Sequence, residues 1–170
     1  MAYRNGQYEG HGYDLWRTPA GVIAELTEEF GALFDPCPIN WDGVTDGLKI
    51  DWPLDQASFV NPPYSNMKEW VEKCYQQWLR GCTVLLLIPP RTCTKYFHQW
   101  VYTYADLRFF KGRIKFLDGR DLEAKLQPAP FPSMLCVYRG NNDPSSLAIA
   151  MELLTDAQLE EFVKIKEGSI

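Results

Sequence analysis

The chain contains 170 residues, of which 46% are hydrophobic and 23% are charged, and its formal net charge is −5. A chain of this length can bury a core without disulfide bridges, and the composition is that of a soluble globular protein. The negative charge argues against a protein that coats DNA without specificity, because such binding depends on neutralising many phosphates. A local basic face could still bind nucleic acid within an acidic whole.

Cysteine usage and hydropathy indicate an intracellular protein. The 5 cysteines are odd in number and contain no C-x-x-C pair, a pattern that favours neither a disulfide framework nor a zinc site. Reduced thiols are typical of a cytoplasmic compartment. The polar N-terminal segment has no signal-peptide core, and no apolar run is long enough to span a membrane. We therefore expect a soluble, cytoplasmic protein that uses neither a metal nor a membrane.

The N-terminal part of the chain predicts a polar arm at 1–15, followed by a single domain at 16–170 that begins with a helix. Thr18 is expected to cap this helix, with Pro19 as its first residue and Gly31 at its end. The apolar residues that share one face of the helix are Val22, Ile23, Leu26 and Phe30.

Prolines interrupt the apolar pattern that follows. Ala32 to Phe34 lead into Asp35-Pro36-Cys37-Pro38, where the prolines stop a strand, and residues 40–56 are predicted to be mostly loop. Ala57 to Val60 form a short predicted strand, which delivers the chain to Asn61-Pro62-Pro63-Tyr64.

Ser65 is the expected cap of a second helix, which ends at Gly81. The side chains that its spacing turns inward are Met67, Trp70, Val71, Cys74 and Trp78. Thr83 to Ile88 is a continuous apolar run, typical of a strand that is buried on both sides, and it ends at Pro89-Pro90-Arg91-Thr92.

The C-terminal part predicts one ring-rich helix and several short strands. In chain order these are the helix at about 93–104, strands at 107–110 and 114–117 around Lys111-Gly112-Arg113, and, after the Pro-rich loop 127–132, a strand at 134–138. A capping box at Thr155 is expected to begin a last helix.

Strands that alternate with helices predict an α/β domain with a largely parallel sheet. In such a sheet, ligands bind in the crevice outside the carboxyl ends of the strands. Unusual loops leave those ends at 35–38, 61–64 and 89–92. We therefore expect these loops to lie side by side and to form the functional site.

Asn61-Pro62-Pro63-Tyr64 is more constrained than a plain turn requires. Proline has a fixed φ and no N–H, and it restricts the preceding residue to extended conformations. The carbonyls of Asn61 and Pro62 and the side-chain oxygen of Asn61 are therefore predicted to form a rigid set of acceptors beside the ring of Tyr64. Such a set suits a planar heterocycle with an exocyclic amino group, whose hydrogens would meet the acceptors.

This tetrapeptide after a strand resembles the signature of S-adenosylmethionine-dependent amino methyltransferases, which act on adenine N6, cytosine N4 or a glutamine amide. From about Trp16 to Tyr138, the ordered pattern is similar to that of the small phage-type DNA N6-adenine methyltransferases. The motifs that carry the similarity are Trp16-x-Thr18-Pro19, Phe34-Asp35-Pro36-Cys37 with Asn40, Asp46-Gly47-Leu48, Asp51-Trp52, Asn61-Pro62-Pro63-Tyr64, Pro89-x-Arg91-Thr92 and Lys111-Gly112-Arg113-x-Lys115-Phe116.

The resemblance implies a Rossmann-like methyltransferase sheet with helices on both faces, S-adenosylmethionine as cofactor and double-stranded DNA as substrate. The catalytic residues that it implies are Asn61, Pro62, Pro63 and Tyr64, with an adenine flipped out of the duplex and stacked on Tyr64. Asp35 matches the Asp that meets the cofactor's methionine part in related enzymes, although Cys37-Pro38-Ile39-Asn40 replaces their glycine-rich loop. The further implied cofactor contacts are Trp16, Thr18, Pro19, Cys37, Asn40 and Asp51.

Basic residues concentrate in one part of the sequence, and aromatic residues flank them. The cluster consists of Lys111, Arg113, Lys115, Arg120 and Lys125. This pattern suits a nucleic-acid backbone and its bases, although a charge cluster can also be a solvated face. Arg91 and Thr92 are candidate substrate contacts, with a surface ion pair or a cap as the equal alternative.

Other functions are compatible with the tetrapeptide. They are methylation of RNA adenine, methylation of a protein glutamine amide, and nucleic-acid binding by an inactive relative. The short chain and the basic cluster argue against a glutamine substrate, and intact Asn61 and Tyr64 argue against lost activity. Protection of phage DNA from restriction is a role that only the resemblance suggests.

Overall fold

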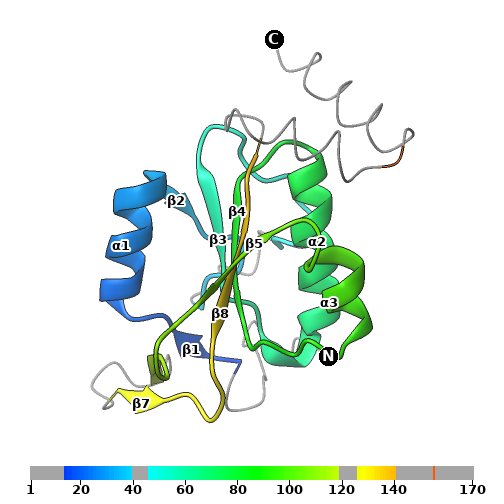
Figure 1. The fold of residues 1–170 in the computed structure, drawn as a ribbon. Coiled ribbons are helices and arrows are strands. Elements are labelled where there is room, and N and C mark those ends of the chain that lie inside the picture. The colour runs from blue at the N-terminus through cyan, green and yellow to red at the C-terminus, as the bar shows by residue number, and fades with distance from the viewer. Residues whose placement is uncertain (1–13, 40–45, 119–125, 141–154, 156–170) are drawn as a thin grey trace.

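The protein is built around a five-stranded sheet with the strand order β2-β3-β4-β8-β5 (Figure 1). This computed structural model describes residues 14–39, 46–118, 126–140 and 155. The strands of the sheet are β2 (Leu33–Phe34), β3 (Ala57–Val60), β4 (Val84–Ile88), β5 (Asp106–Phe109) and β8 (Met134–Tyr138). Strands β2, β3 and β4 are parallel, whereas β8 pairs antiparallel with both β4 and β5.

The predicted α/β class is confirmed, but the sheet is mixed rather than largely parallel. The connections explain the difference. Parallel neighbours need a crossover connection, which helix α2 (Met67–Leu79) provides between β3 and β4. Strand β8 follows β7 (Gln127–Pro128) without a helix between them, and it runs along the sheet in the opposite direction to β4.

Helices cover both faces of the five-stranded sheet (Figure 1). The helices are α1 (Ala20–Phe30), α2 (Met67–Leu79) and α3 (Lys95–Trp100). Along β4, Leu85 and Leu87 join the α1 cluster around Leu26, while Leu86 and Ile88 join the cluster under α2 and α3. Because strand side chains alternate between two covered faces, every residue of β4 is buried. Each such side chain contributes about 1.5–3 kcal/mol of transfer free energy.

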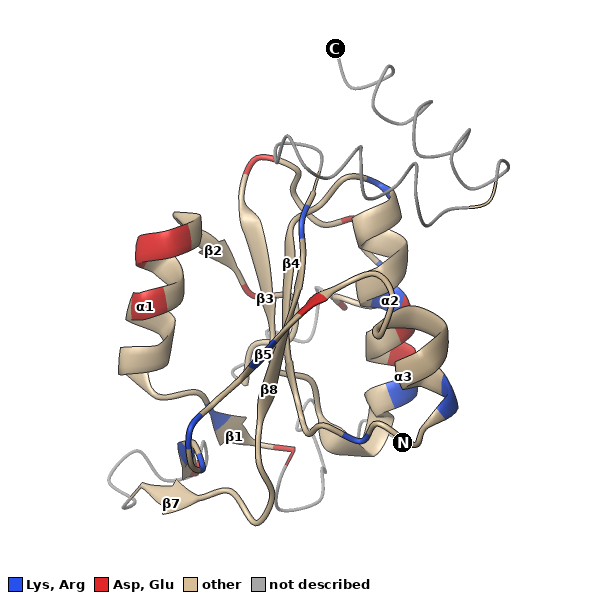
Figure 2. Cartoon of the chain, viewed as in Figure 1, with Lys and Arg blue, Asp and Glu red and all other residues tan. Residues whose placement is uncertain are grey.

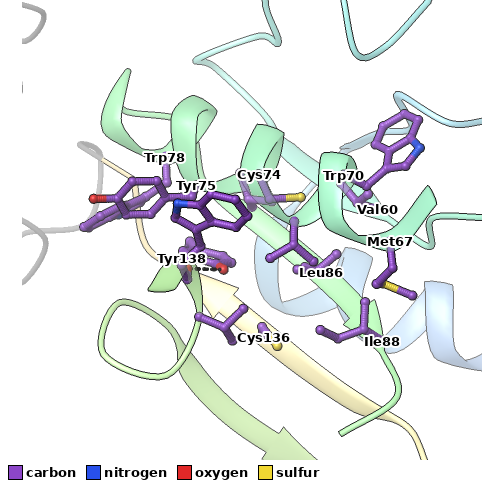
Figure 3. Close-up of a cluster of buried hydrophobic side chains, with 14 of the residues drawn as sticks. Val60, Met67, Trp70, Cys74, Tyr75, Trp78, Leu86, Ile88, Cys136 and Tyr138 are labelled. Carbon is purple, nitrogen blue, oxygen red and sulfur yellow. Dashed lines mark hydrogen bonds between the residues drawn. The ribbon is translucent and has the colours of Figure 1, made fainter. Parts of the chain in front are cut away.

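The cluster on the α2 side is rich in rings, and two of its large rings have bonded polar atoms (Figure 3). The indole N–H of Trp78 donates to the carbonyl of Arg139 at 2.9 Å, and the hydroxyl of Tyr138 donates to the carbonyl of Trp100 at 2.7 Å. Buried polar atoms are costly unless they are bonded, so these contacts allow large rings to fill the core. Burial also raises the pKa of the Tyr138 phenol, which remains a neutral donor.

A second, three-stranded sheet lies beside the first and has the order β1-β6-β7. Its strands are β1 (Trp16–Arg17), β6 (Lys115–Asp118) and β7 (Gln127–Pro128). β1 pairs antiparallel with β6, and the Trp16 ring stacks on the buried ring of Phe116 with centroids 5.1 Å apart. The predicted strands on either side of Lys111-Gly112-Arg113 therefore exist, but they belong to different sheets.

The predicted cap of the first helix is wrong. Pro19, rather than Thr18, occupies the N-cap position of α1, and its carbonyl accepts the N–H groups of Val22 and Ile23 at 3.1 and 3.3 Å. The Thr18 hydroxyl is buried and has no hydrogen-bond partner among the described residues. The Thr18 side chain instead lines a cavity between β1 and the loop after β2. Gly31 ends the helix as expected, with a φ of 78°.

The predicted cap of the second helix is also wrong. Ser65 lies inside a 3-10 turn, η1 (Tyr64–Asn66), and Asn66 takes the N-cap position of α2. The Ser65 N–H donates to the Asp14 carboxylate at 3.0 Å, so a contact distant in sequence replaces the local cap.

The boundaries of other elements follow the prediction to different degrees. Strands β3 and β8 begin and end where the apolar runs predict, whereas α3 stops at Trp100 instead of about 104. Rings are weak helix formers, and residues 101–104 form turns instead. The arm at 1–13 and the helix expected from Thr155 lie outside the described residues. No helix in the described part of the chain is both long and apolar enough to cross a membrane.

Candidate active site

Two pockets open at the carboxyl ends of β2 and β3, where the sequence predicted the functional crevice. The first has a volume of about 330 Å³ and the second a volume of about 350 Å³. The residues that line both pockets are Trp16, Cys37, Pro38, Ile39 and Asn61. The loops at 35–38 and 61–64 therefore meet as predicted, and Asn61 lies in the wall between the two pockets.

Asn61 is held from two directions. Its side-chain NH₂ donates to the backbone carbonyl of Trp16 at 2.9 Å, and its own carbonyl lies 3.5 Å from the Cys37 thiol. The contact with Trp16 fixes which end of the amide is nitrogen, so the side-chain oxygen is left as an acceptor. No donor in the described part of the chain reaches that oxygen. The amide at this turn is therefore oriented by a contact with β1.

The two prolines and Tyr64 complete the turn. Pro62 is buried, and Pro63 lines the first pocket while its carbonyl accepts the Asn66 N–H at 3.1 Å. The Tyr64 ring lies edge-on to Phe131, with centroids 5.2 Å apart, and to Trp16 at 6.5 Å. Burial raises the pKa of the Tyr64 phenol, and the charge of Arg91 opposes the shift, so Tyr64 is neutral at physiological pH.

The loop after β2 is shaped by a short internal bond. The Cys37 N–H donates to the Asp35 carboxylate at 2.9 Å. Desolvation raises the pKa of the Asp35 carboxyl, and the Cys37 bond opposes this effect. Asp35 nevertheless belongs to the exposed residues of the loop. Burial and the Asp35 charge raise the pKa of the Cys37 thiol far above its usual value, so the thiol is a neutral donor.

The first pocket carries negative charge. Carboxylates of Asp14, Asp46 and Glu69 line it, and its described lining contains no Lys or Arg. Each carboxylate also has a structural contact: Asp14 accepts the Ser65 N–H at 3.0 Å, Asp46 accepts the Leu48 N–H at 3.0 Å, and Glu69 accepts the Asn66 amide at 2.7 Å. Asp46 is also paired with the exposed Lys49 at 3.0 Å, which offsets part of the negative charge. Such a wall disfavours phosphate groups and suits a cationic or hydroxyl-bearing ligand.

The second pocket is lined by Arg17, Thr18 and Asp35, among others. It therefore presents a cation, an anion and a buried hydroxyl in one cavity. The Thr18 hydroxyl, which fails to cap α1, is the unpaired polar group of this pocket. A hydroxyl buried without a partner costs free energy, so a ligand that bonds it would recover that cost.

Gly47 explains how the pocket walls fit together. A Cβ at this position would lie 1.9 Å from the Pro36 carbonyl oxygen, so only glycine allows the 46–48 turn to approach the loop after β2. The Trp52 indole N–H donates to the Gly47 carbonyl at 2.8 Å and fixes the same turn. Asp46-Gly47-Leu48 is thus a structural part of the first pocket, although sequence reasoning assigned it no role in the site.

Several predicted site residues lie elsewhere. Asp51 pairs with Arg80 at 3.1 Å and lines neither pocket, and Asn40 lies outside the described residues. Arg91 and Thr92 are exposed and line neither pocket, although the Arg91 charge acts on Tyr64. Pro19 comes directly after Thr18, which lines the second pocket, but Pro19 itself lines neither pocket and is the N-cap residue of α1.

The basic residues Lys111, Arg113 and Lys115 are exposed on the turn before β6 and on β6 itself. Arg113 donates to the Ala129 carbonyl at 3.4 Å. Figure 2 shows Lys and Arg on β1 and on the neighbouring segment between β5 and β7, whereas α1 carries acidic residues. Of the described basic cluster, Lys115 belongs to the three-stranded sheet that contains Trp16, and Lys111 and Arg113 lie in the segment just before it. Arg120 and Lys125 lie outside the described residues.

Sequence reasoning missed some residues of the site. Glu69 follows Asn66 by three positions, so the first turn of α2 could have suggested that both face one way. Phe131 carried no local signal, because its contact with Tyr64 depends on the path of a proline-rich loop. Among the described residues, no three His, Cys, Asp or Glu side chains are grouped so that they could hold a metal ion.

Together, these features define an α/β protein whose parallel strands end at a pair of pockets, which share the oriented amide of an Asn-Pro-Pro-Tyr turn. Comparison with known families makes the class specific. The model of the family described as DNA N-6-adenine-methyltransferase (Dam) matches residues 7–159. The chain belongs to this family, and the resemblance found from its motifs is confirmed.

A relative from a phage supports the same family. The DNA N-6-adenine-methyltransferase of Escherichia phage T1 is 26% identical in an alignment 119 residues long, and the match covers 64% of this chain and 50% of that protein. The chain therefore spans about half the length of the curated relative that it matches.

Proposed function

We propose that this protein transfers a methyl group from S-adenosylmethionine to the N6 amino group of adenine in DNA. The observation that carries the proposal is the position of Asn61, which lies between two pockets with its amide oxygen directed by the Trp16 carbonyl. Membership of the Dam family supports the reaction class, and the name of the phage relative agrees with it.

The residues around both pockets fit the cofactor. S-adenosylmethionine carries a sulfonium and an ammonium charge, a ribose diol and a carboxylate, and it supplies an electrophilic methyl group when bound. The described lining of the first pocket contains carboxylates and no Lys or Arg. Such a lining suits the cationic and hydroxyl-bearing parts of the cofactor. In the second pocket, Asp35 and Arg17 would hold the ammonium and carboxylate of its methionine part, and the Thr18 hydroxyl offers a further bond.

We assign the substrate amino group to Asn61 and Pro62. The Asn61 side-chain oxygen and the Pro62 carbonyl would accept the two N6 hydrogens, which favours a pyramidal nitrogen with an available lone pair. These bonds strengthen as positive charge develops on the nitrogen, so they stabilise the transition state more than the ground state. An amide cannot act as a base, and the proton leaves after transfer.

Tyr64 supplies the platform for the target base. Removing an adenine from the duplex costs a few kcal/mol, and stacking on an aromatic ring returns about 1–3 kcal/mol per base. The neutral phenol of Tyr64 needs no charge for this role. Phe131, whose ring lies 5.2 Å from that of Tyr64, would form part of the same aromatic wall.

DNA itself would contact the basic side of the three-stranded sheet, through Lys111, Arg113 and Lys115. Arg91 and Thr92, which follow β4, would contact the substrate near Tyr64. The fold that we propose for this function is a Rossmann-like methyltransferase domain over 16–170. The protein would act in the cytoplasm of a host cell, and its proposed role is to protect DNA from restriction. Asp51 and Asn40 remain predicted cofactor contacts.

The decisive experiment compares wild-type protein with Asn61→Ala, using S-adenosylmethionine that carries a labelled methyl group. Separate DNA, RNA and protein acceptors are offered, and the labelled nucleoside is identified. We expect label in N6-methyladenine of DNA, and a loss of about 100-fold or more in Asn61→Ala, as for other groups that stabilise transition-state charge. Gln99→Ala, on the exposed side of α3, is the matched control.

Each alternative function has its own outcome in this experiment. Label in RNA adenine or in protein would replace DNA as the substrate, and nucleic-acid binding without transfer would indicate an inactive relative. Near-normal turnover of Asn61→Ala would refute the role given to its side chain.

A further inference from the structure

The bond between Asn61 and Trp16 has a direction that matters. The Asn61 NH₂ is the donor, and the backbone carbonyl of Trp16, at 2.9 Å, can only accept. Position 61 therefore has to present a donor toward β1 and an acceptor away from it. An amide has both groups, whereas an ionised carboxylate has acceptors only.

The Trp16 carbonyl cannot easily turn away from this partner. Trp16 and Arg17 are paired with Asp118 and Leu117 of β6, which fixes the backbone on both sides of the carbonyl. The Trp16 ring is stacked on Phe116, with centroids 5.1 Å apart and planes 21° apart, and Phe116 is 1% exposed. Strand pairing and ring stacking thus hold the acceptor in place.

Position 61 is equally constrained. Pro62 restricts the Asn61 backbone to extended conformations, and the thiol of Cys37 approaches the Asn61 carbonyl at 3.5 Å. With both partners fixed, a change of side-chain chemistry at position 61 cannot be absorbed by movement of the backbone.

We propose that the Trp16 backbone carbonyl is a positioning group that selects an amide over a carboxylate at position 61 and thereby directs the Asn61 oxygen toward the substrate. This inference rests on the proposed function for its catalytic consequence. The orientation itself is a property of the folded protein, so it can be tested without turnover.

The variant Asn61→Asp replaces the amide with a carboxyl group of nearly the same shape, so it tests whether position 61 needs a donor. As a carboxylate, it would face the Trp16 carbonyl oxygen and lose the bond. As a carboxylic acid, it would donate to that oxygen and keep its second oxygen in the position of the amide oxygen. The protonated form therefore reproduces the native arrangement, and the active fraction should be the protonated fraction.

The sign of the pH dependence follows from the surroundings of position 61. Loss of the bond and partial burial both favour the neutral acid, so the pKa of Asp at this position lies above the ordinary value of about 3.9. The ionisable groups that line the adjoining pockets, or lie beside this turn, are Asp14, Arg17, Asp35, Cys37, Asp46, Tyr64, Glu69 and Arg91. The carboxylates among them raise this pKa further, and the arginines oppose the increase. Activity should be present below the raised pKa and should be lost as the pH rises through it.

The first measurement follows the Asp carboxyl carbon of Asn61→Asp by NMR during a pH titration. We expect a midpoint at least about one pH unit above 3.9. Methyl transfer by the same variant, relative to wild type, should fall about tenfold per pH unit above that midpoint, because a single proton controls it. Gln99→Glu adds the same charge on the exposed side of α3 and should follow wild type at every pH.

A second measurement uses the unaltered protein and is independent of whether the variant folds. The Asn61 side-chain amide protons should exchange with solvent at least about tenfold more slowly than those of the exposed Gln99, because one of them is bonded to Trp16. Equal exchange rates for the two amides would overturn the inference, as would an Asp midpoint at or below 3.9 or a pH profile of Asn61→Asp that matches wild type. If wild-type protein methylates nothing, the proposed function fails, while the titration and exchange results still decide this inference.

Discussion

The five-stranded and three-stranded sheets of this protein are held together in different ways. Strands β3, β4 and β8 are buried along their whole length, so apolar burial stabilises the larger sheet. In the smaller sheet, β1 and β7 have two residues each, and β7 is exposed. Its pairing depends on β6 and on the stack of Trp16 on Phe116.

This difference between the two sheets suggests that one sheet mainly determines the stability of the protein and the other the geometry of the site. The larger sheet supplies Asn61 at the end of β3, but the smaller sheet supplies the carbonyl that orients its amide. Substitutions in the larger sheet should therefore act first on unfolding, whereas those around the smaller sheet should act first on binding or turnover. The following variants test this division.

The largest effect is expected from Trp78→Ala, in the core beneath the larger sheet. Trp78 is 1% exposed and donates to the Arg139 carbonyl, so its removal leaves a cavity and breaks that hydrogen bond. The free energy of unfolding should fall by about 3–5 kcal/mol, measured by urea denaturation. Trp78→Phe, which fills more of the space, should cost less. An unchanged denaturation midpoint in Trp78→Ala would contradict this account of the core.

Tyr64→Ala should come next, and its effect should fall on turnover. Loss of a stacking ring is worth about 1–3 kcal/mol, which corresponds to a reduction of roughly 5- to 150-fold in methyl transfer. Tyr64→Phe keeps the ring and should retain much of the activity. If the two variants lose activity equally, the hydroxyl rather than the ring face is what the reaction requires.

Neutralising the basic cluster should weaken DNA binding without changing the fold. Replacing Lys111, Arg113 and Lys115 with Gln should reduce the slope of log K against log salt by about 0.9 for each phosphate that the variant no longer neutralises. A matched triple, in which Lys68, Lys73 and Lys95 become Gln, removes the same charge from α2 and α3. Equal slopes for the two triples would show that the site of the charge does not matter.

The smallest effect is expected at the edge of the larger sheet. Arg108 on β5 makes two bonds to Glu29 on α1, at 2.6 and 2.7 Å, but both side chains are substantially exposed. Arg108→Met should therefore lower the free energy of unfolding by no more than about 1 kcal/mol. The Arg108 bond lowers the pKa of Glu29 from 4.5, so this contribution is present above that pH and is lost as the pH falls through the lowered value. Thermal unfolding of both proteins across this range, with high salt as a control, measures the difference.

The larger sheet could be predicted from the sequence because its signals are local. The apolar run that forms β4 and the short runs that form β3 and β8 are bounded by prolines and polar residues, and each became a strand within one residue of its predicted ends. The direction of β8 was not predictable in the same way, since it depends on the route by which the chain returns. The mixed sheet is the result.

The smaller sheet and part of the site depend on contacts between distant residues. A strand of two residues such as β1 has no periodicity to detect, and it exists because β6 accepts it. The Asn61–Trp16 bond spans 45 residues, so the motif predicted an acceptor at position 61 but not the group that orients it. Thr18 and Ser65 show the reverse case, in which a clear local capping signal is not used: Pro19 and Asn66 take the N-cap positions, and the Ser65 N–H bonds the distant Asp14.

The pairing of β1 with β6 also has a consequence for the order in which the protein matures. Trp16 and Asn61 are both synthesised well before Asp118, yet the carbonyl that orients Asn61 is held by the strand that ends at Asp118. A nascent chain that ends before β6 therefore contains the Asn61 turn without the strand that holds its orienting carbonyl. The orientation of the Asn61 amide should be completed only once the β6 segment has left the ribosomal tunnel.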